Sequence, residues 1–142
     1  MQGVSWNSLQ DQFIALSRGA LRLPMELEWE HACRAGTTTP YSFGETIDEK
    51  QVCLRPEGPV ACGSLPSNPW GFHEMHGNVA EWVEDEYKGE RVAKGGSFGE
   101  DASYAVSSGG FLLPPDSAGY KLGFRVATFP PLGLFRFAPP AP

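Results

Sequence analysis

The chain has 142 residues, of which 41% are hydrophobic and 20% charged, and its formal net charge of −6 corresponds to a pI near 5.0. This length suits one domain, and the hydrophobic content excludes a chain that is disordered by composition. The acidic balance argues against nucleic-acid binding, which requires a basic face. No hydrophobic run approaches the roughly 20 residues of a membrane span and no signal peptide opens the chain, so the cytoplasm is the expected location.

The first predicted element is an amphipathic helix near the N-terminus. Ser5 is a good N-cap, and Gly19 is placed to end the helix. The hydrophobic positions recur at i, i+4 and i+7, as expected for one helical face: Leu9, Phe13 and Leu16. The pattern therefore predicts one helix between Ser5 and Gly19.

A second helix is predicted from Glu26 to Ala35, after a short extended segment at residues 21–24. Three of its first five residues are glutamates, which are favourable at the positive end of the helix dipole. Gly36 is placed to end the helix, because glycine readily adopts the left-handed conformation found there.

The remainder of the domain is predicted to consist of turns and short strands. Residues 37–68 carry turn signals and little periodicity, and the acidic residues 84–86 are expected to lie in a solvated loop. Three strands are expected: Ala80–Val83, Arg91–Lys94 and Leu122–Thr128. The proline-rich residues 129–142 are expected to form an extended tail outside the domain, which comprises residues 1–128.

The cysteines and histidines do not have the spacing of a zinc site. The odd number of cysteines, Cys33, Cys53 and Cys62, leaves at least one unpaired within the chain. Cys53 and Cys62 could form a disulfide across a loop, although free thiols are the expectation for this location. His73 and His76 lie three residues apart, a spacing that a metal pair can use.

Four groups of residues occur in the order that is typical of one known family. They are Arg22-Leu23-Pro24 with Glu26, Glu28, Trp29 and Glu30; Asn68-Pro69-Trp70-Gly71-Phe72; Met75-His76-Gly77-Asn78-Val79 with Glu81 and Trp82; and Gly95-Gly96-Ser97-Phe98, followed by Gly123-Phe124-Arg125. With them the chain resembles the formylglycine-generating-enzyme/sulfatase-modifying-factor family. The same fold occurs in the C-terminal domain of ergothioneine sulfoxide synthases and in the variable proteins of diversity-generating retroelements.

The resemblance implies a loop-rich α+β fold of the C-type-lectin-like type, with two helices packed on short antiparallel strands. The strand-rich lead-in of the family's enzymes has no counterpart here, so we expect the usual pairing of first and last strands to be missing and an edge to be open. Met25 replaces a family threonine that would form a capping box with Glu28. Arg125 is expected to form a bidentate pair with Glu28 or Glu30.

The resemblance does not extend to the catalytic residues of formylglycine-generating enzymes. Those enzymes bind copper(I) through two thiolates beyond the Gly-Gly-Ser motif, since soft sulfur ligands hold copper(I). The corresponding positions here are Glu100 and Ala105, and no cysteine follows Cys62. We therefore predict no catalytic residue, no copper and no iron. Two alternatives stay open: an oxidoreductase with an unfamiliar site, and a decayed paralogue with a structural role.

A structural calcium ion is implied by the family's Gly-Asn-Val-x-Glu-Trp turn. The residues carried over as ligands are the side chains of Glu74 and Glu81 and the carbonyls of Gly77 and Val79. Hard oxygen ligands of this kind suit calcium. The alternative is that Glu74 is solvated and that Glu81 pairs with a base such as Arg125.

The segment after Gly-Gly-Ser, residues 98–122, is rich in small residues and aromatics, the composition of adaptable binding loops. It predicts a non-catalytic module that binds a protein or small molecule, with a retroelement-diversified variable protein as its sharpest form. Surface display or phage association would then replace the cytoplasm as its location. The candidate ligand-binding residues are Phe98, Asp101, Ser103, Tyr104, Ser107, Ser108, Phe111 and Tyr120.

Overall fold

The computed structural model describes residues 3–55 and 57–128, so the predicted tail at 129–142 lies outside the described residues. The elements follow one another as α1 (Trp6–Ser8), η1 (Leu9–Ile14), η2 (Ala15–Ser17), β1 (Leu21–Arg22), α2 (Glu26–Arg34), β2 (Ala80–Tyr87), β3 (Glu90–Lys94), η3 (Ala102–Ala105), β4 (Gly110–Leu113), β5 (Leu122–Phe124) and β6 (Ala127–Thr128). Within this described part, no helix is long and hydrophobic enough to cross a membrane.

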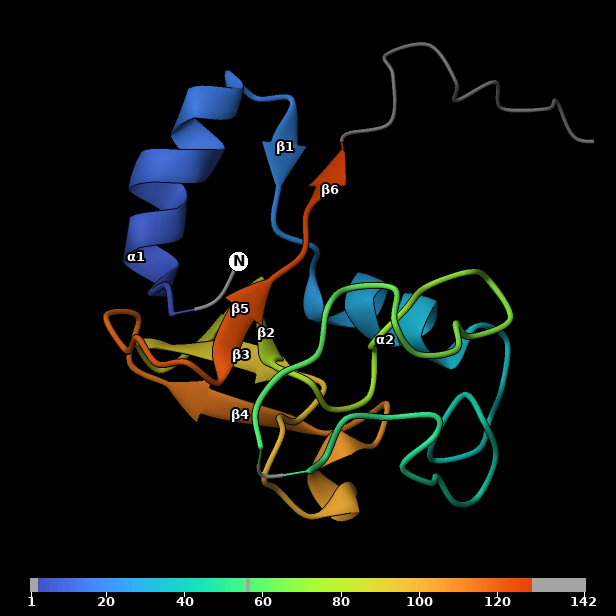
Figure 1. The fold of residues 1–142 in the computed structure, drawn as a ribbon. Helices are drawn as coiled ribbons and strands as arrows, with labels where there is room; N and C mark the ends of the chain where they lie inside the picture. The colour runs from blue at the N-terminus through green and yellow to red at the C-terminus, as the bar shows by residue number, and fades with distance from the viewer. Residues whose placement is uncertain (1–2, 56, 129–142) are drawn as a thin grey trace, which may run out of the picture.

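The predicted N-terminal helix forms from α1, η1 and η2 and projects from the body of the domain (Figure 1). Ser5 caps it as expected, because its hydroxyl accepts a 3.1 Å hydrogen bond from the Ser8 amide. Only the start of the hydrophobic face is buried: Leu9 is 1% exposed, whereas Leu16 is 79% exposed. The reason is the direction of the helix, which leaves the sheet after its first turns.

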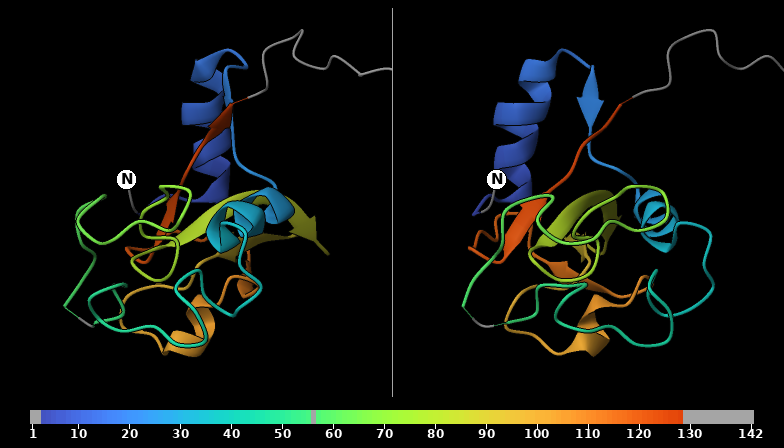
Figure 2. Two further views of the ribbon diagram at one scale, coloured as in Figure 1. Left: turned by 90° about the vertical axis from the view of Figure 1, so that its right-hand side faces the viewer. Right: turned by 45° about the vertical axis from the view of Figure 1, so that its right-hand side comes forward.

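The first and last described strands pair with each other beside the N-terminal helix. β1 and β6 are antiparallel, with Leu21 opposite Thr128 and Arg22 opposite Ala127. The expectation that this pairing would be missing is therefore wrong. Figure 2 shows that this two-stranded ribbon and the N-terminal helix extend from the same side of the body.

The body contains a four-stranded sheet in the order β4-β3-β2-β5. β3 is antiparallel to both β2 and β4, while β5 runs parallel to β2. The single strand predicted at 122–128 is divided into β5 and β6, because the chain leaves β2 after Phe124 and then pairs with β1. β2 extends to Tyr87, so the expected solvated loop at 84–86 is instead part of a strand.

Helix α2 packs on β2 and β3, and its N-terminus is capped by two carboxylates. Glu28 accepts a hydrogen bond of 2.9 Å from the Met25 amide, and Asp85 of β2 accepts one of 2.6 Å from the Glu26 amide. The second cap compensates for the missing threonine. The helix ends as predicted, with Ala35 and Gly36 at positive φ.

Two large indoles organise the core from opposite sides of the sheet region. Trp82 lies in a cluster with Leu9 and Leu23, and Trp29 lies in a second cluster with Met75 and Val83. Both rings are almost completely buried, and both indole N–H groups have acceptors. These two side chains give a loop-rich chain a core that its short strands could not build alone.

Candidate ligand-binding site

The predicted binding segment lies along one side of the body, from the end of β3 to the start of β5 (Figure 1). Gly96, two residues before the segment, has a φ of +69°, and a Cβ atom there would lie 3.0 Å from the Tyr104 carbonyl oxygen. A side chain at this position would therefore separate the segment from the Gly-Gly-Ser turn. The pairing of β4 with β3 and the close contact at Gly96 together fix the position of the segment on the body.

Four of the candidate ligand-binding residues form two aromatic pairs. Tyr104 stacks on Phe111 with ring centroids 5.7 Å apart, and Phe98 packs against Tyr120 at 5.6 Å. Tyr104 is 52% and Tyr120 is 66% exposed. Each pair thus presents one largely exposed tyrosine ring, supported by a second ring that is more buried.

The polar candidates have different environments. Asp101 and Ser103 are exposed, and the Asp101 carboxylate caps η3 by accepting a 2.9 Å hydrogen bond from the Ser103 amide, which lowers the pKa of Asp101. Ser108 is exposed as well. Ser107 is completely buried, with its hydroxyl 3.6 Å from the Cys33 sulfur, so it belongs to the core and not to an exposed face.

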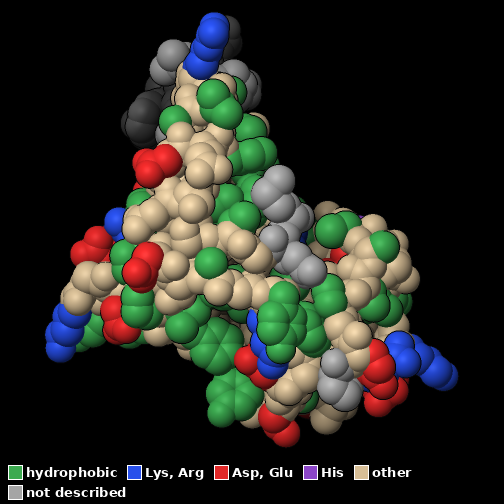
Figure 3. Space-filling view, turned by 60° about the vertical axis from the view of Figure 1, so that its left-hand side comes forward, with side chains coloured by type: hydrophobic (Ala, Val, Ile, Leu, Met, Phe, Trp, Pro, Cys, Tyr) green, Lys and Arg blue, Asp and Glu red, His purple; other side chains and the backbone are tan. Residues whose placement is uncertain are grey.

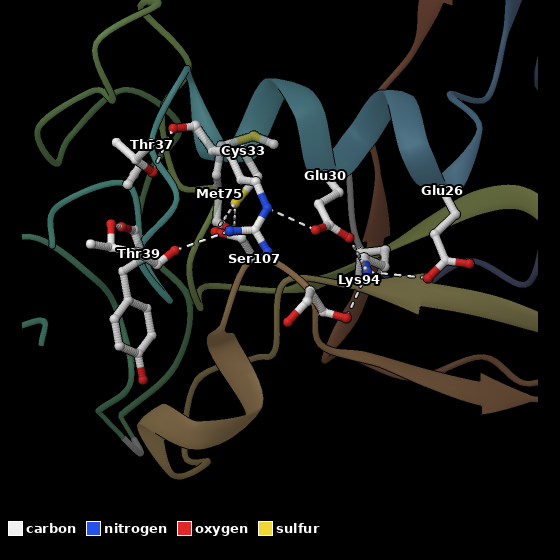
Figure 4. Close-up of polar contacts among 12 residues, drawn as sticks. Glu26, Glu30, Cys33, Thr37, Thr39, Met75, Lys94 and Ser107 are labelled. Carbon is white, nitrogen blue, oxygen red and sulfur yellow. Dashed lines mark hydrogen bonds and ion pairs between the residues drawn. The ribbon is translucent and has the colours of Figure 1, made fainter. Parts of the chain in front are cut away.

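A buried lysine connects this segment to helix α2. Lys94 is fully buried, and its ammonium group lies 3.2 Å from a Glu26 carboxylate oxygen and 3.2 Å from the Ser108 carbonyl oxygen. Glu30 adds a second carboxylate at 3.8 Å. Figure 4 shows Lys94 lying beneath the helix with both glutamates directed toward it. The ion pairs therefore hold the backbone at Ser108 against α2.

A small cavity of about 170 Å³ opens beside the aromatic pairs. Its polar lining residues are a serine, an acid and a base: Ser97, Glu100 and Lys121. Its remaining wall is hydrophobic and consists of Ala80, Phe111, Leu113 and Leu122. Sequence reasoning did not select the three polar residues as ligand-binding, because they come together only where the Gly-Gly-Ser turn meets the chain before β5.

His76 joins three segments beside this site but makes no metal pair with His73. Its Nδ1 donates to the Ala105 carbonyl at 2.7 Å, and its Nε2 accepts from the Ser42 amide at 3.1 Å. His73 is exposed and uses its Nδ1 on the Leu65 carbonyl. Among residues 3–55 and 57–128, no group of three His, Cys, Asp or Glu side chains could hold a metal ion.

The cysteines are free thiols in the described structure, so the alternative of a Cys53–Cys62 disulfide is not supported. Cys62 is exposed, whereas Cys53 donates to the Gly58 carbonyl at 3.4 Å. Cys33 lies in the core near Met75 and Ser107 (Figure 4), and burial raises the pKa of its thiol to about 11. A thiol of this kind stays protonated and unreactive at neutral pH.

Burial of His76 predicts a loss of stability in mild acid. Burial lowers the pKa of His76, whereas an unfolded histidine has a pKa of about 6.5. The unfolded chain therefore binds more protons just below about pH 6.5, and the stability contributed by neutral His76 is lost as the pH falls toward the folded pKa. We expect the Tm measured by circular dichroism to fall between about pH 7 and about pH 5.

His73→Asn is the matched control and should keep this pH dependence. His76→Gln should have a lower Tm at neutral pH and a flatter profile over the same range. Glu28, whose pKa is lowered chiefly by its hydrogen bond to Arg22, titrates below this window. A wild-type Tm that is constant across the window would show that His76 protonates freely in the fold.

The predicted calcium turn lines a second cavity, of about 460 Å³. Glu74, Val79 and Glu81 all face it, so three of the four expected ligand residues come together. Both carboxylates already accept protein donors. Glu74 accepts from the Gly63 amide at 2.8 Å and from the Leu65 amide at 3.1 Å, so it is not simply solvated. The oxygen chemistry fits a calcium ion, because both Glu74 oxygens and Oε1 of Glu81 accept one hydrogen bond each and keep a further lone pair, whereas Oε2 of Glu81 already accepts two.

Glu81 also forms the ion pair that was considered as the alternative to calcium. Its carboxylate accepts two hydrogen bonds from the Arg125 guanidinium, one of them 2.8 Å long, and a third of 2.7 Å from the Trp29 indole. The expectation that Arg125 pairs with Glu28 or Glu30 is wrong. Those two carboxylates bind Arg22 and Arg34, which lie nearer along the chain.

The α+β architecture, with its four-stranded sheet, its β1–β6 ribbon and its loop-rich body, is that of a formylglycine-generating-enzyme-like domain with a C-type-lectin-like fold. The family model of the sulfatase-modifying factor enzyme 1-like domain matches residues 1–129, and the chain belongs to this family.

The similar proteins include one that is named as an enzyme and one that is named as inactive. The chain is 28% identical over 161 residues to formylglycine-generating enzyme of Mus musculus, covering 87% of this chain and 42% of that protein. It is 30% identical over 149 residues to inactive C-alpha-formylglycine-generating enzyme 2 of Bos taurus, covering 88% of this chain and 48% of that protein. Among solved structures, Treponema denticola variable protein 1 aligns with a TM-score of 0.69 and 27% identity, over 78% of this chain and 48% of that one. The chain thus spans less than half the length of each of these proteins.

Proposed function

We propose that the chain is a non-catalytic binding module whose ligand-binding face lies within residues 98–122. The observation that carries this proposal is the exposure of Tyr104 and Tyr120, each supported by a second ring. Exposed tyrosines held in one orientation offer a large contact area at a small entropic cost. Asp101, Ser103 and Ser108 add exposed polar groups to the same segment.

The residues at the copper positions support the non-catalytic part of the proposal. Glu100 and Ala105 cannot act as thiolates, and Ala105 is completely buried. The bovine relative whose name describes it as inactive resembles this chain at 30% identity. The competing proposal is an oxidoreductase with a different active site, and the similarity to the mouse enzyme supports it. Oxygen uptake with a cysteine peptide and added copper(I) or iron(II) would establish it.

The resemblance to a variable protein supports the sharper proposal that residues 98–122 are diversified by a retroelement. Such diversification mutates adenines, so it requires an adenine-rich copy of this coding segment near the gene. Sequencing of the locus decides the point. A template copy would support diversification, and a locus without one would reduce the proposal to a fixed binding module.

Loss of one of the two exposed tyrosines is expected to weaken ligand binding without unfolding the domain. The wild-type protein is screened against small-molecule and glycan libraries by ligand-observed NMR, and each hit is repeated with Tyr104→Ala and Tyr120→Ala. At least one of the two variants should weaken each hit tenfold or more, about 1.4 kcal/mol.

Trp70→Ala is the matched control, because Trp70 is 49% exposed and packs edge-to-face against His31, away from the segment. Hits that survive both tyrosine substitutions but disappear in Trp70→Ala would place the binding face elsewhere and contradict the proposal.

We also propose that calcium binds at the turn containing Glu74, Val79 and Glu81 and stabilises it. Added calcium is then expected to raise the Tm and EDTA to lower it, because an ion that binds only the folded state stabilises that state. Glu74→Gln should reduce this response, whereas Glu49→Gln, in an exposed loop, should leave it unchanged. An identical Tm in calcium and EDTA would mean that the donors from Gly63, Leu65 and Arg125 hold the turn alone.

A further inference from the structure

We propose that the cavity lined by Ser97, Glu100 and Lys121 binds a small zwitterion, an α-amino acid with a hydrophobic side chain. The inference rests on the proposed binding function and names a ligand class for one part of that face. It starts from three polar residues, Ser97, Glu100 and Lys121, whose side chains form no hydrogen bond or ion pair with one another in the described structure.

The base in the cavity has no acidic partner. The Lys121 ammonium lies 5.6 Å from the centre of the Phe98 ring, and no described carboxylate lies within 4.0 Å of it. Lys121 as a residue is half-buried. A carboxylate bound in the cavity would supply the missing opposite charge.

The acid in the cavity keeps one oxygen available. Glu100 is half-buried, and its Oε2 accepts a hydrogen bond of 2.9 Å from the Ser97 amide. That bond fixes the carboxylate at the cavity wall. Its other oxygen accepts no hydrogen bond from the described residues, so it can receive one from an ammonium group, which carries three donors.

The hydroxyl of Ser97 provides a second, independent observation. Ser97 is 1% exposed, and its Oγ is the one buried side-chain oxygen or nitrogen in the described residues without a hydrogen-bond partner. Buried polar groups are rarely unsatisfied, and each requires a partner or costs about 1–3 kcal/mol. Ser97 lines the cavity and its amide binds Glu100, so a polar group of a ligand bound beside Glu100 is the candidate partner for this hydroxyl.

The rest of the cavity selects the size and the side chain of the ligand. Its other lining residues are hydrophobic: Ala80, Phe111, Leu113 and Leu122. At about 170 Å³, the cavity is well below the roughly 300–1,000 Å³ typical of pockets for drug-sized molecules. A single amino acid with a branched aliphatic side chain meets these limits, whereas an oligosaccharide or nucleotide would extend beyond them.

Figure 3 shows, on another part of the surface, hydrophobic side chains that follow the projecting N-terminal helix, where Leu16 is exposed. Among the described residues, that surface carries no buried side-chain polar atom without a partner. The unpaired Ser97 hydroxyl therefore distinguishes the cavity from it.

The test compares leucine with two analogues that each lack one charge. Isothermal titration calorimetry is performed with leucine, with 3-methylbutylamine, which lacks the carboxylate, and with 4-methylpentanoate, which lacks the ammonium. We expect leucine to bind and both analogues to bind at least tenfold more weakly, about 1.4 kcal/mol each. A 4-methylpentanoate affinity equal to that of leucine would overturn the zwitterion in favour of a simple anion.

Substitutions in the chain locate the site. Lys121→Met and Glu100→Gln should each weaken leucine binding at least tenfold, about 1.4 kcal/mol. Lys50→Met and Glu49→Gln remove the same charges from an exposed loop and should leave the affinity unchanged. Circular dichroism confirms that each variant is folded. Unchanged binding in both cavity variants would place leucine elsewhere and overturn the proposal.

The outcome is separable from that of the proposed function. If leucine, valine, methionine and phenylalanine all fail to bind at millimolar concentration, the zwitterion proposal is wrong. Ligands from the library screen that depend on Tyr104 or Tyr120 would in that case still support the binding face. If such ligands also failed to appear, both proposals would fall.

Discussion

Arg125→Met is expected to lower the free energy of unfolding by about 3 kcal/mol, among the largest effects of any single side chain. The guanidinium of Arg125 neutralises the carboxylate of Glu81, whose side chain is 9% exposed, and the two groups share two hydrogen bonds. Methionine would leave that carboxylate buried with the Trp29 indole as its remaining donor. Since the Arg125 side chain is 24% exposed, the loss should fall at the lower end of the 3–5 kcal/mol typical of broken buried pairs.

Urea denaturation followed by tryptophan fluorescence measures this loss. Glu86→Gln is the matched control, because it breaks the ion pair with Arg91 at a site where Glu86 is 51% exposed, and it should cost less than about 1 kcal/mol. The double variant Arg125→Met/Glu81→Gln should be more stable than the sum of the single losses predicts, since the unpaired charge is gone. Equal losses in Arg125→Met and Glu86→Gln would contradict the assignment of a buried pair.

The same variant also bears on the calcium proposal. With Arg125 removed, a calcium ion would be the available opposite charge for Glu81. The Tm of Arg125→Met is therefore expected to rise more with added calcium than the Tm of the wild type. A response no larger than that of the wild type would indicate that Glu81 is not a calcium ligand.

Gly77→Ala is expected to be destabilising by on the order of 3 kcal/mol, because it combines backbone strain with a steric clash. Gly77 has a φ of +81°, and a Cβ atom there would lie 2.5 Å from the Cys53 carbonyl oxygen. That carbonyl also accepts a hydrogen bond of 2.8 Å from the Asn78 amide. A methyl group would push residues around Cys53 away from the turn and break this contact.

Gly19→Ala separates the two contributions. Gly19 has a φ of +80°, but no atom lies within 4 Å of the Cβ position, so alanine there should cost only the backbone strain of about 1 kcal/mol. Thermal denaturation of the two variants should show the larger loss for Gly77→Ala. Similar losses would mean that the Cys53 segment moves aside freely and that contact with it does not require glycine.

The sequence by itself predicted the elements whose determinants are local. Ser5 and Gly19 delimit the first helix, and Gly36 follows the second, because caps and left-handed residues act on the nearest backbone groups. The resemblance that begins at Arg22 and ends at Arg125 identified the fold correctly. The lack of thiols at Glu100 and Ala105 is also a property of the sequence alone.

The partners of charged and polar groups were decided by the tertiary structure. Arg125 binds Glu81, 44 residues away, which is one of several possible partners that the sequence allows, and Asp85 caps a helix 59 residues before it. Neither pairing leaves a periodic signal, because each depends on how β2 lies against β5 and α2. For the same reason Ser107, one of the candidate ligand-binding residues, proved to be a core residue.

The candidate site likewise has features that the sequence predicted and features that only the tertiary structure revealed. Its aromatic composition, with Tyr104 and Tyr120, could be recognised in the chain, since small residues and tyrosines form a compositional pattern. The cavity could not be recognised in the sequence, because Ser97, Glu100 and Lys121 converge only when the Gly-Gly-Ser turn packs against the chain that enters β5. The sequence alone thus determined which chemical groups the protein carries and which it lacks. Only the tertiary structure decided which of them are buried, paired or left open to a ligand, because burial and pairing arise from contacts between distant segments.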